Sequence, residues 1–530
     1  MFTSYEFIVF ISVCFVLYYL IPKRMQPYML LIASYLIYFS INAYYPVYLL
    51  ATTLTVYLTG NLIWQMKRKQ TEHLKEHRAE MSREERRQYK KNYERKMRGV
   101  LVLCLLINLG ILAVTKYTNF FIQNVNAWFH FFGSSREWIF RDMLVPLGIS
   151  FYTFQSIGYL LDVYWGRGEA QTNILKFALF TSFFPQLGQG PISRYHDLSR
   201  TLYKFHRWDW KNIRFGLERM LWGYFKKLVI ADRISAAVSL LTGEPEYYTG
   251  GFVFVGMIFY AIELYADFTG GIDITIGIAQ VFGITITENF ERPFFSKNIA
   301  EYWRRWHITM GTWFRDYVFY PLSISRPFKR MTTFMKKHFG MSAAKRSSVY
   351  VATITVWITT GIWHGANWRY VVWGLCNGVI ILISEELSPL YKRFHNRFPK
   401  LGKTWGYRAF QIARTFLLMC CLRIFDRYGS CRQALKAFVH MFTEFDISAL
   451  TKQEFLELGM TVADYGIIFA GILLIFTVSM IGRRQSVREW LSEKPYLLKY
   501  IAFVSLFFAT ILLGTYGIGY EDSAFIYNQF

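Results

Sequence analysis

The chain has 530 residues, of which 53% are apolar and only 18% are charged, and its net charge is +24. That balance argues against a multidomain cytosolic enzyme, and an aromatic content of 19% excludes disorder, collagen and a charged coiled coil. The positive charge is concentrated in residues 67–98, 323–348 and 391–408, with long apolar stretches between them. This alternation is typical of a polytopic membrane protein and disfavours nucleic acid as a partner.

Many stretches of the chain approach the roughly 20 apolar residues that a membrane span needs. The clearest are residues 5–21, 27–46, 47–65, 99–116, 349–366, 369–386, 408–424, 459–481 and 500–516. Four further apolar segments contain Pro, Gly and ionisable residues, so we expect some of them to be re-entrant or broken: 143–163, 174–191, 213–235 and 248–283. Irregular backbone at membrane depth needs protein or a water-filled cavity around it, so these segments should form a cavity wall.

The basic blocks predict the orientation of the chain. If residues 67–98 are cytoplasmic, the N-terminus lies outside, and the same rule places 323–348, 391–408 and 482–499 inside and 425–458 outside. The block 67–98 is expected to be a helical hairpin on the cytoplasmic side that touches anionic lipid. A docking site for a partner protein is the alternative for this block.

His307 is the first histidine with unusual surroundings. If its segment is one helix, Trp303 and other bulky side chains recur at steps of three and four and form one face. His307 would lie at the edge of that face, with Arg304, Gly311 and Arg315 beside it. An imidazole next to two guanidiniums suits an anionic or carbonyl-bearing ligand. The alternative is a structural histidine whose neighbouring arginines reach lipid headgroups.

His364 is the second, and it closes an apolar segment that begins at Val349. An ionisable group at membrane depth is costly and is therefore a functional candidate. Removal of water favours the neutral imidazole, which could accept a proton from a hydroxyl group. A buried histidine that is hydrogen-bonded for structure alone is the alternative.

Three carboxylates, Glu263, Asp267 and Asp273, lie in another apolar stretch. They could carry protons or a cation in a transporter, or hold a basic side chain in place, and we favour the structural role. A metal site made of His307, His364 and Asp267 is not expected, because no pair of these ligands has a metal-binding spacing such as HxxxH. No P-loop, GxSxG, HExxH or Rossmann fingerprint is present.

Several strings of the sequence, in the same order as in the family, resemble the membrane-bound O-acyltransferase superfamily. They are GISFYTFQSIGYLLDVYWG (148–166), FPQLGQGPISRYHDL (184–198), YADFTGGIDITIGIAQVFGI (265–284), ENFERPFFSKNIAEYWRRWHITMGTWFRDYVFYPL (288–322), TGIWHGANWRYVVWGL (360–375) and FIYNQF (525–530). Within the superfamily, the chain is similar to the bacterial branch that takes part in alginate O-acetylation.

The resemblance implies a single membrane domain over residues 1–530, all-α and polytopic. It implies about 11 transmembrane helices, with shorter or re-entrant ones, in a curved ring around a central tunnel. Residues 143–375 would form the catalytic core, whereas the basic hairpin at 67–98 is unusually long for the family. His364 matches the near-invariant histidine of the superfamily. His307 matches its second signature position, where many members have Asn.

The activity that the resemblance implies is transfer of a short acyl group, acetyl above all, in the bacterial cytoplasmic membrane. The donor would be a cytoplasmic acyl thioester, acetyl-CoA or an acyl carrier, and no bound cofactor or metal is expected. The acceptor would be an extracytoplasmic polysaccharide or an SGNH-type partner protein. His364 would act as the base, and the expected substrate-binding residues are Trp303, Arg304, Gly311, Arg315, Trp363, Asn367, Asp267, Tyr265 and Gln155. D-alanyl transfer to teichoic acid is the nearer alternative, and a proton-coupled membrane carrier is the more distant one.

The predicted orientation adds an expectation about the two histidines. The span from Val349 would start at the inner face, so His364 would lie about 15 residues, or roughly 22 Å at 1.5 Å per residue, toward the outside. His307 precedes a cytoplasmic block and should lie deeper toward the inside. A donor near His307 could then meet an acceptor near His364, and the acyl group would cross the membrane without the donor.

Overall fold

The computed structural model describes residues 2–446, 453–456, 458–516 and 525–526. These residues form helices joined by turns, with one isolated antiparallel bridge between Phe290 and Trp306, which confirms the all-α class. Five described helices are long and apolar enough to cross a membrane, or six if one bent pair is a single span. The chain is thus a multi-pass membrane protein. The figure of about 11 spans, the ring and the tunnel stay predictions.

Two compact units make up the chain. The N-terminal unit comprises Ser4–Ile213 and Ala279–Thr287, and the C-terminal unit comprises Met1–Thr3, Arg214–Ile278 and Glu288–Phe530. The helices of the N-terminal unit are α1 (Tyr5–Leu20), η1 (Lys23–Met25), α2 (Gln26–Ile41), α3 (Tyr45–Glu76), α4 (Arg83–Phe131), α5 (Ile149–Trp165), α6 (Ile174–Ser182), α7 (Phe184–Leu187) and α8 (Tyr195–Leu202).

The remaining helices begin with α9, whose first residues belong to the N-terminal unit. In chain order they are α9 (Trp210–Tyr224), η2 (Phe225–Ala231), α10 (Asp232–Gly243), α11 (Gly251–Val281), η3 (Pro293–Phe295), α12 (Ile299–Arg305), α13 (Ile308–Phe314), η4 (Arg315–Phe319), α14 (Tyr320–Ser323), α15 (Arg326–His364), α16 (Trp368–Glu386), α17 (Ser388–Arg397), η5 (Leu401–Lys403), α18 (Trp405–Arg427), α19 (Cys431–Thr443), α20 (Gln453–Leu456), α21 (Val462–Ile481), α22 (Val487–Ser492) and α23 (Tyr496–Leu513). Of these, η2 and η4 are π-helical turns.

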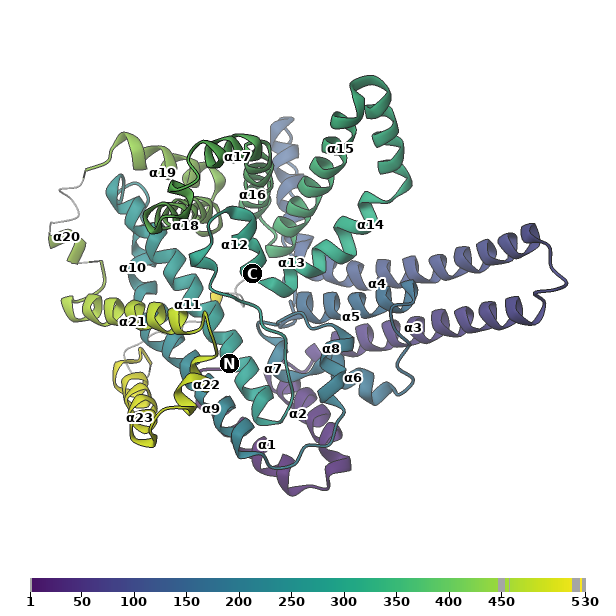
Figure 1. Ribbon diagram of the computed structural model, residues 1–530, viewed down its shortest axis with the longest axis horizontal. Coiled ribbons are helices and arrows are strands. Elements are labelled where there is room, and N and C mark those ends of the chain that lie inside the picture. The colour runs from purple at the N-terminus through teal and green to yellow at the C-terminus, as the bar shows by residue number, and fades with distance from the viewer. Residues whose placement is uncertain (1, 447–452, 457, 517–524, 527–530) are drawn as a thin grey trace. The chain divides into compact units, whose positions relative to one another are not determined.

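The basic block 67–98 is the tip of a helical hairpin, as predicted. Helices α3 and α4 lie side by side in Figure 1 and extend well beyond the apolar segments that they contain. Ser82 starts α4 with a capping box, in which its backbone N–H donates to Glu85 (2.7 Å) and its hydroxyl accepts from the Glu85 N–H (3.2 Å). This reciprocal cap provides a local signal for the turn between the two helices.

The apolar segments with Pro and Gly differ from one another. Segment 174–191 is broken, as expected, into the short helices α6 and α7, and Pro185 lies in the first turn of the second one. Segment 248–283 is instead an unbroken helix of 31 residues, α11, so its polar residues do not interrupt the backbone. Parts of the segment 425–458, which is expected on the outside, lie beyond the described residues, namely 447–452 and 457.

Close contact between α15 and α16 places the end of α15. Helix α15 bends at Gly340, where φ is 82°, and its second arm ends at His364 (Figure 1). A Cβ added at Gly361 would overlap the carbonyl oxygen of Tyr370, and one added at Gly374 would overlap that of Trp357. The two backbones therefore touch at both glycines, and no larger residue fits there without moving a helix.

Gly361→Ala should destabilise the protein by about 1–3 kcal/mol, because the new methyl group overpacks a backbone contact that cannot relax by a side-chain rotation. Thermal unfolding of the detergent-solubilised protein measures this change. Gly466→Ala in α21 is the matched control, because a Cβ there meets no atom within 4 Å. The same loss of stability in both variants would contradict the proposed backbone contact.

Candidate active site

His307 lies at a sharp break between two short helices. Helix α12 ends at Arg305, Trp306 is extended, and His307 has φ 49° and ψ 54° before α13 begins. The continuous helix predicted for this segment is therefore wrong. The residue before the break pairs with a neighbouring segment, since the N–H of Glu291 donates to the carbonyl of Arg305 (2.9 Å). A left-handed conformation is costly for a residue other than glycine and often marks a functional site.

Asn289 orients the His307 imidazole. Nδ1 of His307 lies 3.2 Å from Oδ1 of Asn289, and this oxygen also accepts hydrogen bonds from the N–H (3.1 Å) and hydroxyl (2.9 Å) of Thr309. Because a carbonyl oxygen only accepts, Nδ1 carries the hydrogen and Nε2 holds the lone pair of the neutral ring. Burial, and then the positive charge of Arg423, lower the pKa of His307. The neutral imidazole is thus favoured.

Trp363 connects the two candidate histidines. The centre of its indole ring lies 5.9 Å from that of His307 and 5.0 Å from that of His364. His364 also makes an edge contact with Trp373 of α16, at 4.8 Å between ring centres. His307 is fully buried and His364 is 8% exposed. The structure therefore brings the two histidines and Trp363 into one aromatic cluster.

A small cavity beside His364 is lined by a buried ion pair that the sequence analysis did not predict. The cavity measures about 10 Å³, close to the space that one water molecule needs, and Tyr260, Tyr370, Arg423 and Asp426 are among its lining residues. Arg423 donates to Asp426 at 2.8 Å. An arginine within the apolar segment 408–424 was a usable signal, because a charge at membrane depth is rare without a role.

The residues that were expected beside His307 on a regular helix are exposed. Arg304, Gly311 and Arg315 are all exposed, and Arg315 is paired with Asp316 at 2.8 Å. They were expected to flank the imidazole on one regular helix, and the turn at His307 ends that geometry. Trp303 is only partly buried, and its indole N–H donates to Asn377 (3.2 Å). A substrate-binding role for these residues stays a prediction.

Two other expected site residues make structural contacts. Asn367 caps α16, because its side-chain oxygen accepts a hydrogen bond from the Arg369 N–H (3.0 Å). Asp267 lies 2.7 Å from the Lys227 ammonium and also accepts from the N–H of Ile526 (3.0 Å). The carboxylate therefore joins α11 to η2 and to the C-terminal segment.

The last two expected residues lie in different units. Tyr265 belongs to the C-terminal unit, and its ring centre is 6.3 Å from that of Trp306, next to His307 in the chain. Gln155 belongs to the N-terminal unit, where it is buried and donates to the carbonyl of Phe180 (2.7 Å). Among the described residues, no group of three His, Cys, Asp or Glu side chains could hold a metal ion.

Comparison with known proteins links this geometry to a family. The membrane-bound O-acyltransferase (MBOAT) family model matches residues 170–425, a range that contains both histidines and Arg423. The chain is 31% identical over 407 residues to the probable alginate O-acetylase AlgI of Azotobacter vinelandii, which covers 74% of this chain and 72% of that protein.

Two other relatives have different names. The chain is 32% identical over 330 residues to the peptidoglycan O-acetyltransferase of Helicobacter pylori, covering 57% of this chain and 58% of that protein. It is 25% identical over 353 residues to the teichoic acid D-alanyltransferase of Bacillus subtilis, covering 61% of this chain and 84% of that protein. The named relatives all transfer acyl groups, and the matched region contains the aromatic cluster with both histidines. The chain belongs to the membrane-bound O-acyltransferase family and is an O-acyltransferase.

Proposed function

We propose that the chain transfers acetyl from a cytoplasmic acyl thioester to a hydroxyl group outside the bacterial cytoplasmic membrane. The donor is acetyl-CoA or an acyl carrier, and the acceptor is an extracytoplasmic polysaccharide or an SGNH-type partner protein that modifies it. The observation that carries the proposal is the contact of two buried histidines with one indole, that of Trp363. Because both imidazoles contact the same indole, one can act on the acyl donor and the other on the acceptor of a single acyl transfer.

The reaction requires a base, a stabilised oxyanion and exclusion of water. His364 removes the proton of the acceptor hydroxyl, whose oxygen attacks the carbonyl carbon of the thioester. The carbon–sulfur bond then breaks, and the thiol leaves with a proton. His307, with its lone pair on Nε2, positions the donor by accepting a hydrogen bond. The Arg423 guanidinium stabilises the negative charge that develops on the carbonyl oxygen.

The shape of α15 supports transfer across the membrane. Its second arm begins after the bend at Gly340, and the part of it that follows the basic block, residues 349–364, is roughly 24 Å long at 1.5 Å per residue. That length is most of the thickness of the hydrocarbon core, about 30 Å. With the basic residues 323–348 on the inner side, as the positive-inside rule predicts, His364 lies toward the outer side.

Two alternatives differ from this proposal in chemistry. D-alanyl transfer is supported by the match over 84% of the Bacillus protein, whereas the higher identity to the Azotobacter protein, 31% against 25%, favours acetyl. A proton-coupled carrier would need mobile protons on the carboxylates of α11. Asp267 and Asp273 are instead held in ion pairs with lysine and arginine, which favours a structural role for both.

His364→Ala should lower the rate of acyl transfer by about 10²–10⁴-fold, the usual loss on removing a general base. The measurement is single-turnover transfer from a radiolabelled thioester in the purified protein. His338→Ala, an exposed histidine on the same helix, is the matched control and should keep the full rate. Activity of His364→Ala within a few-fold of wild type would rule out its role as the base.

Two substitutions at His307 separate positioning from proton transfer. Asn and Gly both accept the left-handed backbone conformation, so neither should strain the turn. His307→Asn can still accept a hydrogen bond from the donor and should lose about 10–10²-fold in rate, whereas His307→Gly should lose more than about 10³-fold. Equal and complete inactivity of both variants, with unchanged thermal stability, would make His307 a partner of His364 in proton transfer.

The identity of the acyl group can be read from esters on the cell envelope. Mild alkali should release acetate from the glycans of cells that carry the protein, and much less from cells that carry His364→Ala. Release of D-alanine instead would replace the proposal with its nearer alternative. Purified protein should also free the thiol from a labelled thioester, since an intact thioester in the presence of acceptor would indicate a carrier.

A further inference from the structure

The small cavity beside His364 is a place where α11, α15, α16 and α18 of the C-terminal unit meet. His364, Arg423 and Asp426 line it, together with Leu264, Trp373 and two tyrosines. Its volume of about 10 Å³ is close to the space that one water molecule needs. The acyl-transfer mechanism described above gives Asp426 no role beyond its ion pair with Arg423.

The walls of the cavity contain polar atoms that the surrounding side chains do not satisfy. Asp426 accepts from Arg423 with Oδ2 (2.8 Å), and within the described part of the chain its other oxygen, Oδ1, has no hydrogen-bond partner. The same is true of Nη2 of Arg423 and of Nε1 of Trp373. Asp426 is 8% exposed, Arg423 is 5% exposed and Trp373 is 1% exposed. Because buried polar atoms are nearly always hydrogen-bonded, a water molecule in the cavity is the expected partner.

We propose that one water molecule in this cavity connects the His364 imidazole to the Asp426 carboxylate, and that Asp426 is a positioning residue for the base. The ring nitrogen of His364 that faces the cavity donates its hydrogen to the water, and the water donates to Oδ1 of Asp426. Nη2 of Arg423 also donates to the water, which then has three partners, a usual number for a buried water. This role of Asp426 rests on the proposed function of His364 as the base.

The hydrogen-bond chain decides which nitrogen of His364 accepts the proton. With the ring hydrogen on the cavity side, the lone pair lies on the other nitrogen, which takes the proton of the acceptor hydroxyl. The ring is then positively charged, and the carboxylate of Asp426 stabilises this charge through the water. The same proton passes to the sulfur when the carbon–sulfur bond breaks. Asp426 stays ionised throughout, so the protein gains and loses no proton over the reaction.

Asp426 is the source of negative charge in this cavity. Of the other lining residues, Arg423 stays positive and the two tyrosines stay neutral near neutral pH. Arg369 adds a fixed positive charge behind the wall, where its guanidinium donates to the Tyr370 hydroxyl (2.8 Å). Loss of the Asp426 charge should therefore change how readily the His364 ring holds a proton.

Asp426→Asn tests the carboxylate, because the amide keeps the size of the side chain and can still accept a hydrogen bond from Arg423. The assay is single-turnover transfer from radiolabelled acetyl-CoA by the purified full-length protein, measured over a range of pH. We expect the maximal rate to fall about 10–10²-fold, while the acetyl-CoA concentration that gives half of this rate changes less than about three-fold. The wild-type rate should rise with pH as the imidazole loses its proton. The midpoint of that rise should lie about one pH unit lower in Asp426→Asn, since the imidazolium loses a stabilising charge.

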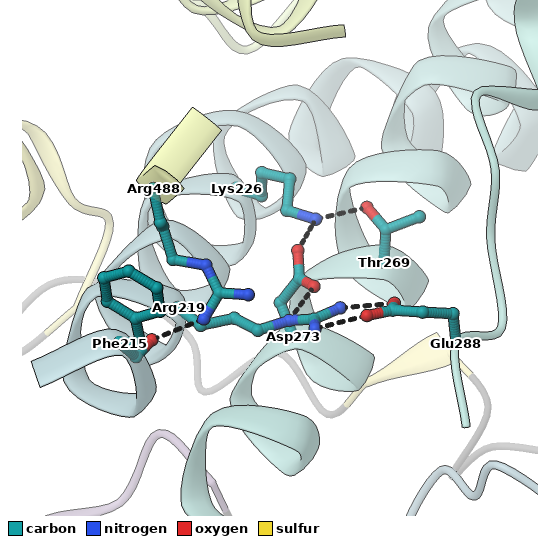
Figure 2. A network of polar contacts seen from close by, with 7 residues as sticks. All are labelled: Phe215, Arg219, Lys226, Thr269, Asp273, Glu288 and Arg488. Carbon is teal, nitrogen blue, oxygen red and sulfur yellow. Dashed lines mark hydrogen bonds and ion pairs between the residues drawn. The ribbon is translucent and has the colours of Figure 1, made fainter. Parts of the chain in front are cut away.

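Asp273→Asn is the matched control. Asp273 belongs to the same unit, accepts from Arg219 (2.8 Å) and Lys226 (2.6 Å), and does not line the cavity beside His364 (Figure 2). This variant also loses a carboxylate that is paired with a cation, but it should keep the wild-type pH midpoint and a rate within a few-fold. Equal loss of rate in both variants, or an unchanged midpoint in Asp426→Asn, would overturn the proposal.

A second pair of variants displaces the water and leaves every charge in place. Leu264 lines the cavity and is 2% exposed, so Leu264→Phe should fill the space of the water. We expect a lower pH midpoint and a rate loss of about ten-fold. Leu241→Phe in α10 is the control, because Leu241 is 1% exposed and does not line the cavity. Unchanged rate and midpoint in Leu264→Phe, with cooperative thermal unfolding, would contradict the water site even if Asp426→Asn does not fold.

His364→Ala in the same assay separates this proposal from the proposed function. If His364→Ala is inactive but Asp426→Asn keeps the wild-type rate and pH midpoint, His364 remains the base and the role of Asp426 is wrong. If His364→Ala is as active as wild type, the proposed role of His364 fails, and that of Asp426 fails with it.

Discussion

The candidate active site depends on one buried arginine, Arg423. Its side chain is paired with Asp426, and its guanidinium lies over the rings of Trp306, at 4.8 Å, and Trp373, at 5.7 Å. A buried charge without partners would cost several kcal/mol, so α18, α16 and the turn after α12 must stay packed around this cation. Trp306 directly precedes His307 in the chain, and the ring of Trp373 contacts that of His364. The same ion pair thus holds both imidazoles in place.

Charges inside the apolar helices serve structure as well as chemistry. Asp267 is bonded to Lys227 and to a backbone N–H near the C-terminus, so it ties three separate segments together. Asp273 accepts from Arg219 and Lys226, which joins α11 to α9 and η2. An ionisable group at membrane depth is therefore not by itself evidence of catalysis. Their partners decide which role they have.

The sequence predicted the helical class and the basic hairpin, because each depends on local signals, whereas the roles of the two histidines stay predictions. Apolar stretches, charge blocks and short motifs can be read without knowing any long-range contact. It predicted wrongly that the segment around His307 is one helix, since the spacing of its bulky residues continues across the break. Pairing with residues 289–291, which lie more than ten positions earlier, decides that turn. The role of Asn289 was missed for the same reason.

The sequence by itself determined the kind of protein, an all-α membrane O-acyltransferase, because composition and short motifs can be read from the chain without any tertiary contact. Only the tertiary structure decided which groups meet. The contact of His307 with Trp363, the position of Arg423 over Trp306 and Trp373, and the bonds from Arg219 to Asp273 and Glu288 (Figure 2) each join residues that are distant in the chain. Burial removes the water that would otherwise solvate these groups, so their partners come from whichever helices pack against them.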